Sequence, residues 1–174
     1  NQSIKNNSLT KLLKKFFVQK GDTFFIPAGT IHAIGPGILL VEIQQNSNIT
    51  YRVYDYKRKD SDGNFRELHI EKALDVINTF PAKITPPGKN NKKNILVDCE
   101  KFFVERIFLS SLNKIYSGKI INKFKFLLCV DGKINFKCGD FSCVINKGEN
   151  VFIPANCKNK FILKGEGEFL IISE

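Results

Sequence analysis

The sequence contains no methionine and no tryptophan in its 174 residues, and it has no apolar run long enough to span a membrane. It also lacks the charged and then apolar amino terminus of a secretory signal peptide. A complete translated protein normally begins with methionine, whereas this chain begins with Asn1, so we expect it to be a piece of a longer chain. The length suits one large domain or two small ones.

Acidic residues are scarce, with 17 Asp and Glu against 27 Lys and Arg, which leaves a net charge of +10. Such a surface could attract nucleic acid or phosphorylated small molecules. The lysines are scattered, however, and no basic stretch alternates with aromatic residues as single-strand binding requires. We therefore favour solvated lysine faces, and we expect neither a nucleic-acid partner nor a membrane partner. A basic nucleic-acid-binding barrel stays the weaker alternative.

Cysteine pairs with C-x-x-C spacing, typical of zinc knuckles and redox motifs, are absent. The five cysteines are an odd number, and all follow residue 98: Cys99, Cys129, Cys138, Cys143 and Cys157. We expect all five to be reduced and mostly buried in a cytoplasmic protein, without a disulfide or a metal.

The first half of the chain is predicted to hold short strands and one helix. Residues 38–45 and 49–56 read as a pair of strands around a turn at 46–48. Alternation along the first of these strands would place Leu40, Glu42 and Gln44 on one face. Residues 69–78 carry the apolar spacing of a packed surface helix, and His69 near its start is expected at the surface or as a cap.

Residues 85–94 have no apolar side chain outside their prolines, which predicts a linker. Every later segment reads as strand. Residues 123–130 and 133–137 flank Asp131-Gly132, a strong signal for a two-residue hairpin turn. Further runs follow at close spacing, at 141–145, 151–153, 161–163 and 169–172. This spacing indicates a sandwich or a small barrel.

An internal repeat connects the two halves. Residues 20–28 (KGDTFFIPA) and 147–155 (KGENVFIPA) differ only at three central positions, one of them an Asp/Glu exchange. We interpret them as two copies of one β unit, in which Gly and the acid form a turn and Pro-Ala ends the strand. Five residues after the proline the first copy has His32, whereas the second has Asn159.

The spacing from Gly21-Asp22 through Pro27-x-Gly29 to His32 resembles the second signature motif of the cupin β-barrels. The longer match is more specific. Residues 26–35 (IPAGTIHAIG), 40–47 (LVEIQQNS) and 50–55 (TYRVYD) resemble the bacterial type I mannose-6-phosphate isomerases. The resemblance is strong over residues 18–77, and the second β unit resembles a degenerate cupin.

This resemblance implies a mainly β protein of two cupin-type, jelly-roll units with one or two short helices. Residues 1–84 would be the carboxy-terminal part of a catalytic cupin domain, which is incomplete in this chain. Residues 85–94 would be the linker, and residues 95–174 a degenerate cupin domain that binds no metal, with Asn159 in place of the histidine.

Carried over by position, the family's zinc ligand falls on His32, a glutamate of the site on Glu42 and the substrate-facing arginine on Arg52. Arg58 is a weaker candidate for the phosphate. The family also needs a Gln-x-His pair and another glutamate, and no Gln-x-His or His-x-His occurs in residues 1–174. We therefore expect one zinc ion per full-length subunit, with its other ligands outside this chain.

The implied reaction interconverts mannose 6-phosphate and fructose 6-phosphate through a cis-enediol, so the expected partner is a phosphorylated hexose. Two alternatives stay open. Glu42 and Arg52 could instead be a structural cross-strand ion pair. The chain could also be a cupin module that binds sugar or regulates without catalysis.

Overall fold

The computed structural model describes residues 2–6, 8–78, 83–85, 94–118, 123–157 and 160–174. The chain divides into two compact units, Asn1–Pro87 (unit 1) and Gly88–Glu174 (unit 2). The division falls inside the segment 85–94 that the sequence predicts as a linker, although Lys83–Thr85 and Asn94–Asp98 are strands and residues 86–93 lie outside the described residues.

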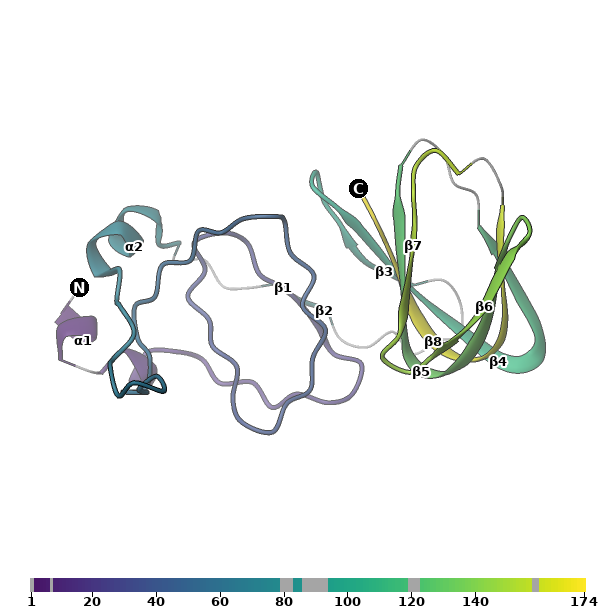
Figure 1. Cartoon of the computed structure of the whole chain (residues 1–174). Coiled ribbons are helices and arrows are strands. Elements are labelled where there is room, and N and C mark those ends of the chain that lie inside the picture. The colour runs from purple at the N-terminus through teal and green to yellow at the C-terminus, as the bar shows by residue number, and fades with distance from the viewer. Residues whose placement is uncertain (1, 7, 79–82, 86–93, 119–122, 158–159) are drawn as a thin grey trace. The chain divides into compact units, whose positions relative to one another are not determined.

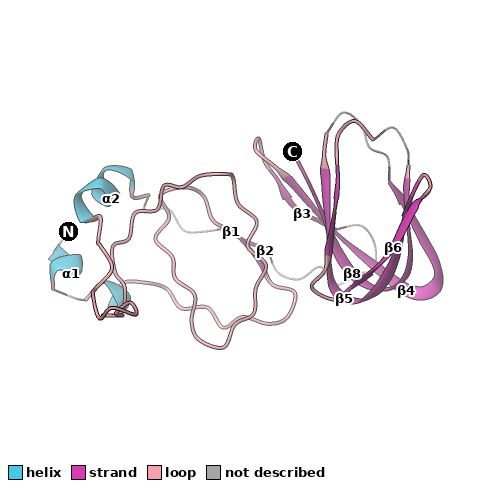
Figure 2. Ribbon diagram, in the orientation of Figure 1, coloured by secondary structure: helices cyan, strands magenta, loops and turns pink. Residues whose placement is uncertain are grey.

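Loops make up most of unit 1 (Figures 1 and 2). Its elements are α1 (Gln2–Lys5), a 3₁₀ helix (Leu9–Lys11), β1 (Thr23–Phe25), α2 (Ile70–Val76) and β2 (Lys83–Thr85). Strands β1 and β2 pair antiparallel and form a small sheet. Helix α2 confirms the predicted helix and buries Ala73. Among the described residues, no helix is long and apolar enough to cross a membrane.

The predicted pair of strands at 38–45 and 49–56 is wrong. Both segments are loops, and no strand pairing is recorded for them among the described residues. A strand is stable only when its backbone pairs with a neighbour and one face is covered. Here apolar side chains that such strands would have to bury stay in solvent, because those of Leu39 and Ile49 are 95% and 66% exposed. The expected alternation around Glu42 does not form either.

Unit 2 is a β structure in which long, curved strands wrap around one core (Figure 1). The order in the sheet is β3-β4-β8-β5-β6, and β7 pairs with β5; every recorded pairing is antiparallel. The strands are β3 (Asn94–Asp98), β4 (Phe103–Gly118), β5 (Lys125–Cys138), β6 (Phe141–Asn146), β7 (Asn150–Ile153) and β8 (Phe161–Ser173).

The apolar core lies in unit 2. Side chains from β4, β5, β6, β7 and β8 form one cluster, with Phe161 and Leu163 fully buried at its centre. The burial pattern of β8 alternates at its start, as expected for a strand with one face on a core. In the described part of unit 1, only Ile4, Leu9 and Ala73 are buried apolar side chains.

The predicted hairpin at Asp131-Gly132 is also wrong. Strand β5 runs through these residues without turning, and β8 likewise joins the predicted strands 161–163 and 169–172. The pairing of β5 with β8 shifts register between Cys129 and Asp131, which is a β-bulge. Gly132 has a φ of 80°, the left-handed conformation that makes Asp-Gly common in hairpin turns and in bulges alike.

Both copies of the repeat fold into the same local structure. The acid at the turn, Asp22 or Glu149, accepts a hydrogen bond from the backbone N–H three residues earlier, at 2.8 Å in each copy. Its own N–H donates back to the carbonyl of that residue, Gln19 or Asn146, at 3.1 and 2.9 Å. A short strand follows in each copy and ends before the Pro-Ala pair. The repeat therefore encodes a turn and strand twice, once in each unit.

Candidate functional site

His32 lies in the loop that follows β1. The loop is held against the end of α2, because the N–H of Asn78 donates to the carbonyl of Gly29 at 2.8 Å. A Cβ atom at Gly29 would lie 2.2 Å from the carbonyl oxygen of Val76, so only glycine permits this approach. The glycine of the Pro-x-Gly-x-x-His motif thus positions the histidine loop on the helix.

The ring of His32 is exposed, and its Nδ1 lies 2.9 Å from the carbonyl oxygen of Thr30. A carbonyl can only accept, so Nδ1 is the donor in this contact. This geometry leaves Nε2 as the nitrogen through which histidine could bind a metal while a backbone carbonyl orients the ring.

The remaining metal ligands are not gathered around His32. Glu42 is exposed in a loop, and the described residues contain no group of three or more His, Cys, Asp or Glu that could hold a metal ion. A zinc site needs three or four ligands. The described part of the chain therefore could supply one ligand of such a site, His32, but not the full set.

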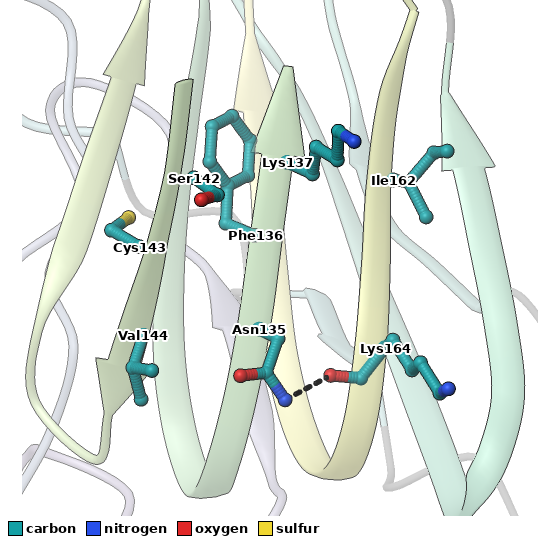
Figure 3. Close-up of a pocket in the computed structure, with 8 residues that line it drawn as sticks. All are labelled: Asn135, Phe136, Lys137, Ser142, Cys143, Val144, Ile162 and Lys164. Carbon is teal, nitrogen blue, oxygen red and sulfur yellow. Dashed lines mark hydrogen bonds between the residues drawn. The ribbon is translucent and has the colours of Figure 1, made fainter. Parts of the chain in front are cut away.

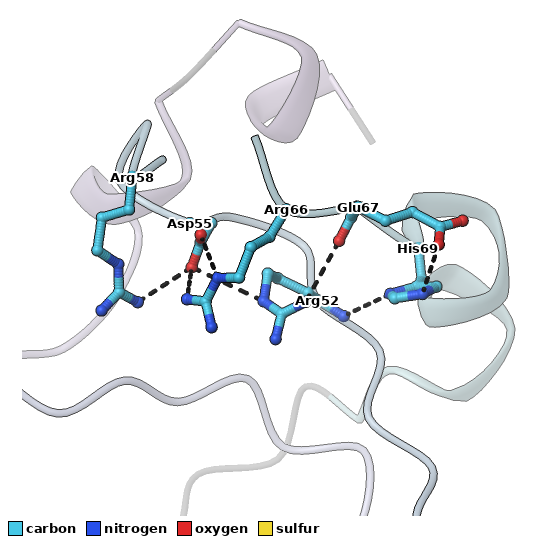
Figure 4. A network of polar contacts seen from close by, with 6 residues as sticks. All are labelled: Arg52, Asp55, Arg58, Arg66, Glu67 and His69. Carbon is cyan, nitrogen blue, oxygen red and sulfur yellow. Dashed lines mark hydrogen bonds and ion pairs between the residues drawn. The ribbon is translucent and has the colours of Figure 1, made fainter. Parts of the chain in front are cut away.

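A cluster of charged side chains surrounds Asp55, whose own side chain is buried (Figure 4). Arg66 donates to both carboxylate oxygens, from Nε to Oδ2 at 2.7 Å and from Nη2 to Oδ1. Arg58 donates from Nη2 to Oδ1 at 3.0 Å, and Nε of Arg52 lies 3.7 Å from the same oxygen. Three arginines that lie within 14 sequence positions of one another thus share one carboxylate. We call these four residues the Asp55 cluster.

Arg52 is further fixed through its backbone and its guanidinium group. Its N–H donates to Nδ1 of His69 at 3.3 Å, and the N–H of His69 donates to the carbonyl of Arg52 at 2.8 Å. Its Nη1 donates to the carbonyl of Glu67 at 3.4 Å. His69 is the N-cap residue of α2, but its side chain caps no helical N–H. The ring supports Arg52 instead.

The charges of the Asp55 cluster shift the pKa values of its members. The hydrogen bond from Arg66 is the largest cause that holds the pKa of Asp55 below its usual value, with Arg58 adding to it. The same bond raises the pKa of Arg66. The carboxylate is therefore ionised at neutral pH, and the cluster carries three positive charges against one negative charge.

This arrangement suits an anionic ligand. The side chains of Arg58 and Arg66 are 63% and 42% exposed, so their outer N–H groups can reach a solute. Guanidinium groups stay charged and bind carboxylates and phosphates through paired hydrogen bonds. Asp55 restrains the arginines without neutralising them all.

The structure brings together two of the residues singled out in the sequence, Arg52 and Arg58, and leaves Glu42 and His32 outside the Asp55 cluster. The recorded carboxylate partner of Arg52 is Asp55 rather than Glu42, so the alternative of a Glu42–Arg52 ion pair is not observed among the described residues. Sequence reasoning missed Asp55 and Arg66. The three-residue spacing of Asp55 from both Arg52 and Arg58 was the available signal.

Unit 2 has an open pocket of about 420 Å³ on its sheet (Figure 3). The described residues of this unit contain no group of side chains that could hold a metal ion. It is lined by residues of β5, β6 and β8: Asn135, Phe136, Lys137, Ser142, Cys143, Val144, Ile162 and Lys164. Asn135 donates to the carbonyl of Lys164 at 3.2 Å, so this amide joins the neighbouring strands β5 and β8.

Asn159, which replaces the histidine of the first copy, lies outside the described residues.

Comparison with known proteins shows similarity to one family. Residues 91–174 match the family model described as "Mannose-6-phosphate isomerase, cupin domain". A Bacillus subtilis protein named mannose-6-phosphate isomerase ManA is 34% identical over 97% of this chain and 54% of its own length. A Streptococcus mutans mannose-6-phosphate isomerase is 36% identical over 85% of this chain and 47% of its own length.

The chain is similar to mannose-6-phosphate isomerases along nearly its whole length, and residues 91–174 match the cupin-domain model of that family. A crystal structure of the mannose 6-phosphate isomerase from Bacillus subtilis superposes with a TM-score of 0.56 at 26% identity, covering 74% of this chain and 41% of that one. The predicted mainly β, cupin-type fold is thereby confirmed. The chain spans about half the length of the curated relatives it matches.

Proposed function

We propose that residues 1–174 form part of a mannose-6-phosphate isomerase and contribute the Asp55 cluster to its substrate site. The observation that carries the proposal is that Arg52, which the family resemblance assigns to the substrate, lies among three arginines around one buried carboxylate. The similarity to proteins named mannose-6-phosphate isomerase over nearly the whole chain supports it. The substrate would be a phosphorylated hexose.

The arginines would bind and orient the negative charges of substrate and intermediate. Aldose-to-ketose isomerisation moves one proton between C2 and C1 through a cis-enediol, whose oxygens gain negative charge in the transition state. Arg52, the least exposed of the three side chains, is assigned to this developing charge. Arg58 is assigned to the phosphate, for which its more exposed guanidinium group suits a dianion arriving from solvent.

Glu42 is assigned to proton transfer in the same reaction. A carboxylate can accept the proton at one carbon and return it at the other when it lies within hydrogen-bond reach of both. In the described residues Glu42 has no ion pair with Arg52 that would hold it in a purely structural role.

Zinc belongs to the proposal as one ion per subunit, with His32 as the ligand that this chain supplies. The orientation of the ring by Thr30 supports this role. The other ligands would lie in sequence that the relatives have and that residues 1–174 do not contain. In the same scheme, unit 2 is a metal-free companion cupin domain.

A second candidate is a cupin module that binds a phosphorylated sugar without catalysis. The absence of a complete ligand cluster among the described residues favours it. Binding of mannose 6-phosphate without turnover, in a protein that carries all the sequence of the relatives, would decide for this candidate.

The Arg52→Ala variant tests the proposal in a protein that joins residues 1–174 to the additional sequence of the relatives. We expect turnover to fall by at least ~100-fold, which corresponds to ~2.7 kcal/mol of transition-state stabilisation. Lys72→Ala, which removes an exposed charge from α2 in the same unit, is the matched control and should retain activity. Near-normal turnover in a folded Arg52→Ala variant would reduce Arg52 to a structural partner of Asp55 and Glu67.

A further inference from the structure

Unit 2 brings two cysteines from different elements into contact. Cys138 is the last residue of β5, and Cys157 lies in the turn that follows β7. Their sulfur atoms are 3.2 Å apart although the residues are 19 positions apart in sequence. This contact is independent of the Asp55 cluster, which lies in unit 1, and of the proposed isomerase activity.

The backbone around both cysteines is held by hydrogen bonds. Cys138 pairs with Phe141 on β6 and with Phe161 on β8. The N–H of Cys157 donates to the carbonyl of Pro154 at 3.1 Å. Both side chains are half-buried against the apolar core, which limits how far the sulfur atoms can separate.

The other cysteines have different surroundings. The thiol of Cys129 donates to the carbonyls of Asp131 and Gly132 beside the bulge, and the thiol of Cys99 donates to the carbonyl of Phe102. Cys143 lies on β6, half-buried on the same core. Among the described contacts, the pair of Cys138 and Cys157 is the one that joins two sulfur atoms.

We propose that Cys138 and Cys157 form a reversible disulfide when the protein meets a low-molecular-weight disulfide such as oxidised glutathione. The pair is then a modification site of unit 2. In the described structure all five cysteines are free thiols.

The reaction balances as two thiol–disulfide exchanges. One cysteine, as thiolate, attacks a sulfur of oxidised glutathione, forms a mixed disulfide and releases one glutathione thiolate. The second cysteine attacks the protein sulfur of that mixed disulfide and releases the second glutathione thiolate. The two protein thiols lose two electrons, oxidised glutathione gains them, and the two protons pass to the released glutathione thiolates.

The surroundings make the pair slow to react with such an oxidant at neutral pH. Burial, with the contact to Cys157 adding to it, raises the pKa of the Cys138 thiol to about 11. The thiol is therefore protonated at neutral pH, and only a small fraction is present as the reactive thiolate. Oxidation is best followed at mildly alkaline pH over hours.

The bond would close a chain segment that contains β6 and β7. It would tie the turn after β7 to the end of β5, whereas the pairing of β7 itself is with the start of β5. A crosslink of this kind stabilises a fold chiefly by restricting the unfolded chain. Oxidised unit 2 should therefore unfold at a higher temperature than reduced unit 2.

The test oxidises the 174-residue chain with oxidised glutathione and counts the thiols that remain. We expect the count to fall from five to three, and a peptide map without reductant to link the peptides that contain Cys138 and Cys157. The midpoint of thermal unfolding of unit 2 should rise by about 5 °C or more and return to its starting value on reduction.

Cys143→Ser is the matched control, because it removes a half-buried thiol on the same core and leaves the pair intact; it should still lose two thiols. Cys138→Ser and Cys157→Ser should each form no intramolecular disulfide. A folded chain that keeps five thiols under these conditions, or that links Cys143 to either partner, would refute the proposal.

Discussion

Asp55 shows how one residue organises the charged part of unit 1. Without its carboxylate, three guanidinium groups would meet with no compensating charge, which is costly where the side chains are partly shielded from water. Arg66 approaches with two donors and Arg58 with one, so the two contacts differ in strength. This difference can be measured, because it determines how easily the carboxyl group takes up a proton.

We predict that the Asp55 carboxyl titrates below the usual range of aspartate, and that Arg66→Gln raises its pKa more than Arg58→Gln does. The hydrogen bond from Arg66 is the largest cause of the lowered pKa. NMR titration of the Asp55 carboxyl carbon in the three proteins checks the order. Equal shifts in the two variants would mean that Asp55 responds to overall charge and not to its bonded partner.

The same pKa sets a pH dependence of folding. The pKa of Asp55 is lowered in the folded chain, so its contribution to stability is present above about pH 4 and is lost as pH falls through the lowered folded value. Unit 1 should therefore loosen on acidification below about pH 4. Asp55→Asn should remove this part of the acid sensitivity, measured by thermal unfolding between pH 3 and pH 7.

Among the elements, the bulge in β5 depends on a close approach of two strands. At Gly132 an added Cβ would lie 2.2 Å from the carbonyl oxygen of Glu166, and at Gly167 it would lie 2.2 Å from that of Asp131. Both glycines have positive φ. The Asp-Gly pair is therefore used at a bulge that lets β5 continue along β8, rather than at a turn that would end it.

Gly132→Ala should destabilise unit 2 by at least ~2 kcal/mol more than Gly148→Ala. Gly148 has a similar φ of 86°, but nothing lies within 4 Å of its added Cβ. The stability loss of Gly148→Ala therefore measures only the backbone strain of an alanine at positive φ. The difference between the two variants reports the clash with β8. Chemical denaturation gives both values, and equal losses would show that the strands separate easily at the bulge.

At the scale of the whole chain, the two units differ in how much apolar surface they bury. Large apolar side chains of unit 1 such as Phe17 and Leu39 are almost fully exposed, whereas unit 2 has a continuous core. Apolar burial is the dominant stabilising contribution to folding. The two units should therefore differ in stability.

Limited proteolysis of the 174-residue chain should remove unit 1 first and leave a resistant product close to residues 88–174. Mass spectrometry of the time course identifies the cuts. Gly132→Ala should make the product more sensitive, because it weakens the sheet of unit 2. Cleavage of both units at the same rate would mean that they unfold together.

The 174-residue chain by itself should show no isomerase activity with added zinc and should bind zinc weakly. Affinity for zinc comes from several ligands held together. Among the described residues, no group of three or more potential ligands includes His32. Isothermal titration with zinc and an assay with mannose 6-phosphate check this, with the Bacillus subtilis relative as the positive control. Zinc-dependent turnover by residues 1–174 would overturn the assignment of the missing ligands.

Features that depend on neighbours in sequence could be predicted from the sequence alone. The turn at each repeat forms between residues three apart, and α2 follows the apolar spacing of residues 69–78. The apolar runs of unit 2 lie in strands, because alternating or continuous apolar residues there always meet the same core. The family motif likewise singles out His32 and Arg52 as candidates because its residues lie close together along the chain, and their roles stay predictions.

The tertiary structure decided what depends on distant partners. Residues 38–56 have the composition of strands but no recorded pairing, while Asp131-Gly132 has the composition of a turn but is held straight by β8. Arg66 joins Asp55 from 11 residues away, and Cys157 meets Cys138 from 19 residues away. The intrinsic preference of a residue for helix, strand or turn contributes only about 1 kcal/mol to stability. Strand pairing, packing and ion pairs with remote segments therefore override it.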